Sequence, residues 1–324
     1  MAILVRKPGL FTTVQDEGRD GFYALGFPPS GAMDKFSYRV GNMLVNNRPG
    51  SASMEATYIA PELEFRAPTV VAVTGGEIRC VLNGEPIRTW ASFSVQAGDL
   101  LCFETLKSGA RVYISVAGGV DVEPVLDSRS TYTLTGIGGF KGRTLEAGDL
   151  LPIGSSSVAT PGRRVSDQMI PNFGQETVLR VIVSLCSYRF TETALETFLE
   201  TAWTITPDAN RTAYRYKGPP LELIERDQPF GAGNDQSNVV DMPYPLGSIQ
   251  VPGGIEPILL LADAVTAGGY ATLGTVIGAD LPVAGQTRTG GRVRFEAVSL
   301  DEALRARSQA QTFLMKIQRD IEVG

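Results

Sequence analysis

The sequence of 324 residues contains no histidine. This absence excludes Ser-His-Asp and Cys-His catalysis, a zinc site of the HExxH type, and an imidazole that acts as general base near neutral pH. Any proton transfer by this chain must therefore use Asp, Glu, Lys, Tyr, Cys or water. If the chain belongs to an enzyme, its carboxylates or a second chain must supply the acid and base groups.

Cysteine is also scarce, with three residues at Cys80, Cys102 and Cys186 and no CxxC spacing. Each lies in an apolar, strand-like run, where a reduced cysteine behaves as a small hydrophobic side chain. The apolar stretch Ala2–Val5 is too short for a signal peptide. No apolar run reaches the roughly 18 residues of a membrane span. We expect a reduced, cytoplasmic protein without a membrane partner.

Basic residues are outnumbered, because 29 Lys and Arg face 35 Asp and Glu and the formal net charge is −6. They also form no cluster. This balance argues against nucleic acid or an anionic membrane surface as a partner.

Glycine and proline are plentiful, at 36 and 20 residues, and favour turns over long helices. Apolar, β-branched runs at 70–73, 78–82 and 112–116 each end in a glycine or Asn-Gly turn, which is typical of a mainly β barrel or sandwich. At about 150 residues per domain, the length predicts two domains. We place them at 1–155 and 165–324, on either side of the Gly/Ser/Pro-rich segment 154–164.

Two kinds of local pattern predict particular turns and helices. The phrase Ala-Gly-Asp-Leu-Leu occurs at 97–101 and 147–151, with a looser copy at 289–295, and predicts equivalent hairpin turns. Helices are expected to begin near Asp34, near a capping box at Thr193, and near a second capping box at Ser299.

The densest polar cluster combines segments 9–19 and 29–34. The second segment leads into the helix that begins near Asp34, so Ser30 and the amides around Gly31 are candidates to bind an oxyanion at the helix N-terminus. The simpler alternative is that Ser30 and Asp34 only cap the helix. Gln15 and Arg19 are candidates to bind a substrate carboxylate or phosphate, although Arg19 can equally form an ordinary ion pair.

Further candidates are scattered along the chain. Thr74 and Glu77 flank a predicted Gly75-Gly76 turn, which can approach a ligand or be a plain hairpin. Arg129 lies in a hydroxyl-rich loop that suits an oxyanion. In the second half, Gln250 interrupts an apolar strand, Asp263 ends a strand, and Tyr270 follows a glycine pair. The carboxylates of Asp34, Glu77 and Asp263 are the catalytic candidates, and no metal site is predicted.

The motif Gly9–Arg19 followed by Gly26–Asp34 resembles the opening of the KipA family, which is also called the 5-oxoprolinase C-subunit family or the allophanate hydrolase subunit 2-like proteins, of the biotin-dependent carboxyltransferase type. The resemblance extends from about Gly9 to Ala303. Further matching segments are 61–65, 74–75, 82–84, 115–121, 128–131, 138–143, 173–174, 247–252, 257–261, 263, 268–270 and 279–282.

The resemblance implies two cyclophilin-like β-barrel units and a KipI-like partner, the B subunit of the complex. It also implies a third, LamB/YcsF-type protein, the A subunit, and a role in the ATP-dependent opening of 5-oxoproline to glutamate, or of a related small amide or lactam. The chain would then be an enzyme subunit that is inactive alone. No biotin-attachment motif occurs, so no covalent cofactor is expected, and ATP would bind at a site shared with the partner. The run Gly136–Phe140 lacks the spacing of a nucleotide-binding fingerprint.

Two other functions remain open at this point. The chain resembles the carboxyltransferase component of a biotin-dependent urea or amide carboxylase, and it also resembles non-catalytic antagonists of a kinase inhibitor. The sequence departs from the family pattern at Glu77, Tyr132 and Ala264–Ala267, so a changed substrate is expected to show itself there.

Overall fold

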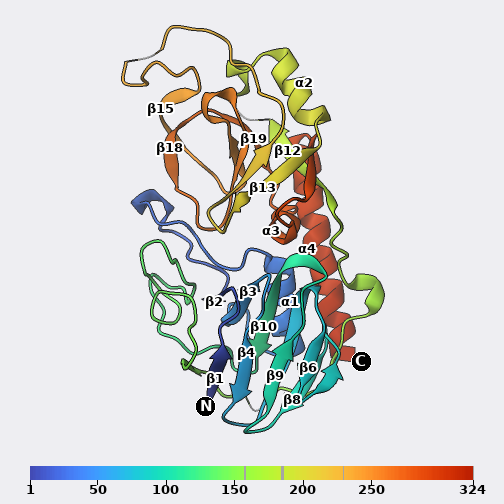
Figure 1. The fold of residues 1–324 in the computed structure, drawn as a ribbon. Helices are drawn as coiled ribbons and strands as arrows, with labels where there is room; N and C mark the ends of the chain where they lie inside the picture. Colours follow the sequence, from blue (N-terminus) through green and yellow to red (C-terminus); the bar gives the residue numbers. More distant parts are fainter. Residues whose placement is uncertain (157, 184–185, 229, 324) are drawn as a thin grey trace. The chain divides into compact units, whose positions relative to one another are not determined.

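The computed structural model describes residues 1–156, 158–183, 186–228 and 230–323. Over these ranges the chain is mainly β, with 20 strands and four α-helices. It divides into two compact units (Figure 1). Unit 1 comprises 1–20, 30–173 and 311–324, and unit 2 comprises 21–29 and 174–310. By this division, segment 21–29 belongs with the second half of the chain and segment 311–324 with the first.

Unit 1 contains two antiparallel sheets, of six and five strands. The order in the six-stranded sheet is β11 (Leu150–Pro152), β1 (Ala2–Lys7), β4 (Glu62–Phe65), β9 (Leu100–Phe103), β6 (Cys80–Leu82) and β7 (Glu85–Ile87). The order in the five-stranded sheet is β2 (Phe11–Gln15), β3 (Ser53–Thr57), β10 (Ser108–Val116), β5 (Thr69–Glu77) and β8 (Ser92–Val95).

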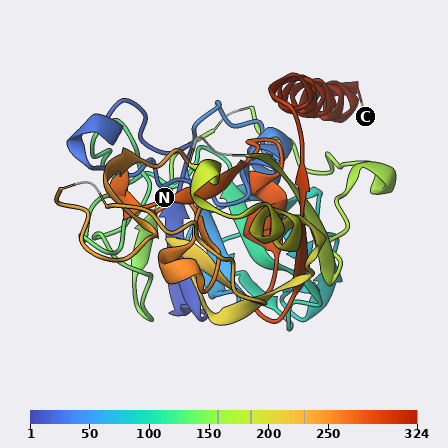
Figure 2. The same cartoon turned by 90° about the horizontal axis from the view of Figure 1, so that it is seen from above.

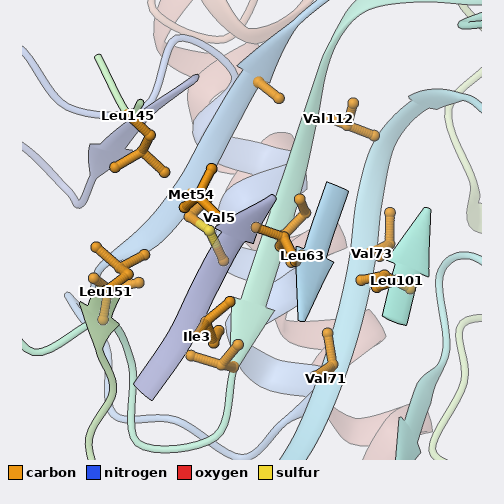
Figure 3. Close-up of a cluster of buried hydrophobic side chains, with 14 of the residues drawn as sticks. Ile3, Val5, Met54, Leu63, Val71, Val73, Leu101, Val112, Leu145 and Leu151 are labelled. Atoms are coloured by element: carbon orange, nitrogen blue, oxygen red, sulfur yellow. The ribbon is translucent and has the colours of Figure 1, made fainter. Parts of the chain in front are cut away.

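The main core of unit 1 lies between these two sheets. Side chains such as Val5 and Leu63 from the six-stranded sheet meet Met54, Val73 and Val112 from the five-stranded one (Figure 3). All five are fully buried. Strand alternation gives each sheet one apolar inner face. The same alternation lines a closed barrel, so the sequence could not distinguish the expected barrel from the two open sheets that are present.

The repeated Ala-Gly-Asp-Leu-Leu phrase makes the same turn twice, as predicted. The amides of Gly98 and Gly148, both at φ 92°, donate to the carbonyls of Phe65 and Val5 in the neighbouring strands. The following aspartate in each copy accepts the amide three residues before it, at 2.7 Å. Each turn therefore leads into a strand of the six-stranded sheet, β9 or β11, in the same way.

Helices cover the outer face of the five-stranded sheet. Helix α1 (Lys35–Leu44) packs through Val40 and Leu44 in one apolar cluster with Ile317 of α4 (Leu300–Val323). The ring of Phe36 stacks on Phe313 of α4 with 5.8 Å between centroids. Helix α4 is a single continuous helix, drawn in red (Figure 1; Figure 2). It begins in unit 2 and ends in unit 1.

Two of the three predicted helix starts are confirmed. Asp34 caps α1 by accepting the amide of Ser37 at 2.9 Å. Ser299 and Glu302 form the capping box of α4. The predicted box at Thr193 is wrong, because α2 (Glu192–Glu200) is capped two residues earlier by Thr191. Thr193 fits the capping-box pattern through Glu196, whereas Thr191 is followed three residues later by Ala194, so the pattern selected the wrong threonine.

Unit 2 is built around a closed barrel of seven strands. Around the barrel the order is β12 (Glu176–Val183), β19 (Thr272–Val276), β16 (Ser248–Gln250), β17 (Ile258–Leu260), β14 (Ala213–Lys217), β13 (Trp203–Ala209) and β20 (Arg292–Ala297). The β12–β20 pair is parallel and the others are antiparallel.

Smaller elements complete the two units. Strands β15 (Asn238–Pro243) and β18 (Ala267–Tyr270) form a separate ribbon in unit 2, and α3 (Leu281–Gln286) follows β19. Single turns of 3₁₀-helix occur at Tyr23–Leu25, Asp167–Met169, Ser187–Arg189 and Pro252–Gly254. Among the described helices none is both long and apolar enough to cross a bilayer.

Helix α2 is attached to the barrel of unit 2 through aromatic side chains. The ring of Phe198 stacks on Phe295 of β20 at 4.6 Å and lies 6.2 Å from Trp203. The indole of Trp203 donates to the carbonyl of Phe198 at 2.9 Å. Phe198 has no exposed surface, so α2 depends on this ring for its attachment.

We predict that Phe198→Ala lowers the free energy of unfolding by about 3–5 kcal/mol, because a buried ring is replaced by a cavity. Phe230→Ala is the matched control, since that ring is fully exposed. Urea denaturation followed by tryptophan fluorescence measures both. Equal midpoints for the two variants would contradict the assigned packing.

Candidate functional site

In unit 1 the early polar motif is organised around the carboxylate of Asp16, directly after β2. This carboxylate accepts hydrogen bonds from the hydroxyls of Ser128 and Ser130, from the amide of Gly18 at 2.8 Å, and from the amide of Arg129 at 2.5 Å. Asp16 is 6% exposed. A buried carboxylate needs such donors to replace its hydration. The bonds join two segments that are more than a hundred residues apart.

Gln15 and Arg19 bind the same loop through consecutive carbonyls. The Arg19 guanidinium donates to the Ser130 carbonyl at 2.6 Å, and the Gln15 amide donates to the Thr131 carbonyl at 3.1 Å. Both side chains are buried. The Oε1 atom of Gln15 has no hydrogen-bond partner within the part of the chain that the structure describes.

The glycine run that follows this loop allows a close approach rather than phosphate binding. Gly138 has φ +67°, and a Cβ there would lie 2.2 Å from the Ser130 carbonyl oxygen and 3.0 Å from the Arg19 guanidinium. A Cβ on Gly139 would lie 1.8 Å from the Thr131 hydroxyl. The run contains an isolated bridge at Ile137, and turns rather than a helix follow it. These residues do not fit a nucleotide phosphate.

The predicted oxyanion loop packs against the Asp16 segment. Ser30 has φ 52°, a left-handed value that is uncommon for serine. Its hydroxyl is buried without a hydrogen-bond partner among the described residues. A Cβ on Gly31 would lie 2.7 Å from the amide nitrogen of Gly18, and the Ala32 amide donates to the carbonyl of Asp16 at 2.9 Å. The loop is thus held by its backbone.

The next two amides of this loop also bind protein atoms. The amide of Met33 donates to the carboxylate of Glu55 at 2.8 Å, and the amide of Asp34 donates to the hydroxyl of Tyr113 at 2.8 Å. Tyr113 in turn donates to Glu55 at 2.7 Å. These two amides are therefore occupied. Asp34 caps the helix, whereas the hydroxyl of Ser30 does not, and oxyanion binding by Ser30 and the amides around Gly31 stays a prediction.

Glu55, Arg111 and Tyr113 form a buried polar group that the sequence prediction missed. Glu55 on β3 lies opposite Tyr113 on β10, and 3.6 Å separates its Oε1 from the Nε of Arg111. Burial, and then the Glu55 carboxylate, raise the pKa of Tyr113 well above its ordinary value. The available signal was the charge at positions 55 and 111, each of which interrupts an apolar strand.

Asp34 and Thr74 fix the first turn of α1. The two carboxylate oxygens of Asp34 accept the amide and the hydroxyl of Ser37. The hydroxyl of Thr74 donates to the carbonyl of Ser37 at 2.7 Å. Asp34 and Thr74 are each 1% exposed, and their roles in substrate chemistry stay predictions.

Glu77 lies apart from this cluster, at the end of β5. Its side chain is 65% exposed, and the Lys107 ammonium is 3.8 Å away. Gly75 and Gly76 do not form the predicted turn, because both lie inside β5. They lie where the β5–β10 register shifts, and a Cβ on Gly75 would lie 2.4 Å from the carbonyl oxygen of Arg111. Glycine here marks a bulge.

Arg129 presents its guanidinium outside the Asp16 cluster. Its Nε donates to the carbonyl of Val122 at 2.8 Å, and its Nη2 lies 3.8 Å from the carboxylate of Asp121. The side chain is 38% exposed. Only the backbone amide of Arg129 therefore joins the cluster of Asp16.

Unit 2 contains a cavity of about 550 Å³ that Gln250 lines. Its other lining residues come from the end of β13, from the β13–β14 turn, from β14 and β17, and from the segments flanking β17. They are Asp208, Asn210, Thr212, Ala213, Arg215, Glu256, Ile258, Leu260 and Val265. The volume is within the range of small-molecule sites.

Asp263 holds the rim of this cavity. It forms a bidentate ion pair with Arg211, with distances of 2.8 and 3.1 Å, and each side chain is 4% exposed. The Asp263 amide donates to the Arg211 carbonyl at 3.0 Å, and the Leu261 amide donates to the Thr212 carbonyl at 2.8 Å. The pair thus fixes the turn that carries Asn210 and Thr212.

Tyr270 lies on the β15–β18 ribbon and is not among the residues that line the cavity. Its backbone amide and carbonyl both bind the hydroxyl of Tyr244. The phenol ring is partly exposed. Among the described residues, no group of three His, Cys, Asp or Glu side chains is placed to hold a metal ion.

Comparison with known proteins gives the family. Residues 25–297 match the model of the carboxyltransferase domain, subdomain A and B. The chain belongs to this carboxyltransferase domain family. It is 33% identical over 310 residues to the C subunit of 5-oxoprolinase from Haemophilus influenzae, covering 96% of each chain. It is likewise 32% identical to the C subunit of the Escherichia coli 5-oxoprolinase, again covering 96% of each.

Family members also occur inside longer proteins. The urea amidolyase of Saccharomyces cerevisiae is 32% identical over 324 residues, which are 97% of this chain and 18% of that protein. The crystal structure of the Kluyveromyces lactis urea amidolyase superposes with a TM-score of 0.91 at 32% identity, covering 98% of this chain and 20% of that one. The chain thus spans about a fifth of the urea amidolyases that it matches.

We predict that Asp16→Asn lowers the free energy of unfolding by about 3 kcal/mol, because hydrogen bonds to a buried charge contribute about 1.5–3 kcal/mol each. In the variant an NH2 group also replaces one carboxylate oxygen and faces the N–H and O–H donors that bind Asp16. Asp20→Asn is the control, since Asp20 is exposed. Thermal unfolding measures the stability, and hydrogen exchange at the amides of Gly18 and Arg129 locates the loss. Unchanged exchange at both amides would contradict the assigned hydrogen bonds.

We predict that Asp263→Asn destabilises the chain by about 3–5 kcal/mol, because Arg211 is left charged and buried. Asp208→Asn, at an exposed position, should change stability by less than about 0.5 kcal/mol. Chemical denaturation of both variants distinguishes the two possible roles of Asp263. A variant that loses activity in the assembled complex while keeping full stability would make Asp263 catalytic rather than structural.

Proposed function

We propose that this chain is the C subunit of an ATP-dependent 5-oxoprolinase, which opens 5-oxoproline to glutamate, or the equivalent part of a related complex that hydrolyses amides or lactams. The observation that carries the proposal is the match to the C subunits of two 5-oxoprolinases along 96% of both chains. In the urea amidolyases, in contrast, the matching part is 17% and 18% of the longer protein.

The polar groups support a chain that acts within a complex. The carboxylates of Asp16, Asp34 and Asp263 each bind neighbouring protein groups, and no imidazole is available. In the structure each of these carboxylates holds a neighbouring segment of the protein. An accessible carboxylate or a partner can supply further acid and base groups. We propose a KipI-like protein, the B subunit, as the direct partner, with a LamB/YcsF-type protein, the A subunit, as the third component.

We propose that this chain does not bind ATP by itself. The glycine run at 136–140 packs against Arg19 and Thr131 and does not fit a phosphate. A nucleotide site would therefore be contributed mainly by the partner proteins.

A second candidate is the carboxyltransferase component of a biotin-dependent urea or amide carboxylase. The superposition on the Kluyveromyces lactis urea amidolyase, with a TM-score of 0.91 over 98% of this chain, favours it. In this case biotin would be carried outside these 324 residues, which contain no biotin-attachment motif.

The proposal is tested by reconstitution. We expect ATP-dependent release of glutamate from 5-oxoproline when the full chain is mixed with its KipI-like and LamB/YcsF-type partners, and no release when any one chain is left out. The parallel assay supplies urea, bicarbonate, ATP and a biotinylated carrier. Carboxylation of urea without glutamate release would establish the second candidate, and neither reaction in the assembled complex would overturn both.

A further inference from the structure

Three side chains from neighbouring strands lie in one row along the cavity in unit 2. Arg215 on β14 lies opposite Ile258 on β17, and Ile258 lies opposite Gln250 on β16. Directly opposed residues point to the same face of a sheet. Neighbouring strands are about 4.8 Å apart, so the backbones of Arg215 and Gln250 are separated by about 10 Å. A guanidinium and a carboxamide therefore flank an apolar floor.

Arg215 retains hydrogen-bonding capacity at one end of this row. Its Nη1 donates to Glu256 at 2.7 Å, and its side chain is 46% exposed. In the described part of the chain its Nε and Nη2 make no hydrogen bond to other protein groups. A planar guanidinium with open donors is suited to bind a carboxylate in two-pronged geometry.

Gln250 supplies a different chemistry at the other end. No side-chain hydrogen bond ties Gln250 to another described residue, and the residue is partly buried. A primary carboxamide offers one donor and one acceptor side by side, which match the carbonyl and N–H of an amide. Asn210 is oriented nearby, because its Oδ1 accepts the amides of Thr212 and Ala213 at 2.7 and 3.2 Å.

The charges of the cavity select against a simple anion. Its ionisable lining residues are Asp208, Glu256 and Arg215, which give one excess negative charge. Phosphate or sulfate would be repelled by this excess negative charge, and neither has an N–H group that could donate a hydrogen bond to the carboxylates. A ligand that carries both a carboxylate and an amide N–H satisfies Arg215 and an acidic side chain together.

We propose that this cavity binds small molecules that combine a carboxylate with an amide or lactam, with the carboxylate at Arg215 and the amide at Gln250. 5-Oxoproline is such a molecule, and choosing it as the probe rests on the proposed function. Ile258 and Leu260, which are 4% and 3% exposed, form the apolar surface beneath the methylene groups of the ring.

The test is calorimetric titration of the full purified chain with 5-oxoproline, with 2-pyrrolidinone (the lactam without the carboxylate) and with urea. We expect saturable binding of 5-oxoproline that is at least about tenfold tighter than binding of 2-pyrrolidinone, because the latter lacks the charge-assisted bonds. Arg215→Gln should remove this preference. Gln250→Leu should weaken both lactams.

The matched control is Arg292→Gln, an exposed arginine on β20 that does not line the cavity. It should bind 5-oxoproline as the unmodified chain does, and circular dichroism checks that all variants fold. Absence of saturable 5-oxoproline binding would overturn the inference, as would equal affinities in the chain and in Arg215→Gln, or tighter binding of urea. Glutamate release that persists unchanged in a complex containing Arg215→Gln would leave the proposed function standing and remove this site.

Discussion

The burial of the Asp16 carboxylate is the constraint on which much of unit 1 depends. A charge with 6% exposure is tolerated only where several donors replace water. Here the donors come from the Gly18 turn and from the loop at 128–130. Once these two segments are joined, Arg19 and Gln15 meet consecutive carbonyls of the same loop. The glycine run then has to pack closely around them.

The Arg211–Asp263 pair imposes a comparable constraint in unit 2. Its charges satisfy each other in bidentate geometry, and its backbone bonds tie the β13–β14 turn to the segment after β17. In both units, then, a buried carboxylate, Asp16 or Asp263, holds a loop. The side chains of the proposed ligand site, Arg215 and Gln250, are not part of either buried group.

Local chemistry made some features of this structure predictable from sequence. The aspartates that follow Gly98 and Gly148 close their own turns, and Asp34 and Ser299 cap their helices, because each interaction spans only a few residues. The pairing of Glu55 with Tyr113 depends on the register of β3 against β10. That register is set by long-range packing, which a single sequence does not reveal. Long-range packing also decides whether the strands of unit 1 form two open sheets or a closed barrel, so the sequence did not reveal this either.

In the candidate site, too, single residues were predictable from the local sequence, whereas their neighbours in space were not. Gln250 was identifiable because an amide interrupts an apolar strand, but its neighbours Arg215 and Ile258 come from two other strands. Conversely, Ser30 and the amides around Gly31 were predicted to bind an oxyanion because a helix begins there. The next amides along the chain, of Met33 and Asp34, already bind Glu55 and Tyr113, which are remote in sequence. A pattern of donors therefore indicates a site only when the remote acceptors are also known.

Arg215 differs from the buried arginines in the free energy needed to change its partner. Its ion pair with Glu256 is 46% and 30% exposed at the two side chains, and exposed pairs of this kind contribute only about 0–1 kcal/mol. A carboxylate ligand can therefore share or replace Glu256 at small cost. Breaking the buried Arg211–Asp263 pair would instead cost about 3–5 kcal/mol. The rigid pair can thus keep the rim of the cavity in place while the exposed pair beside it exchanges partners.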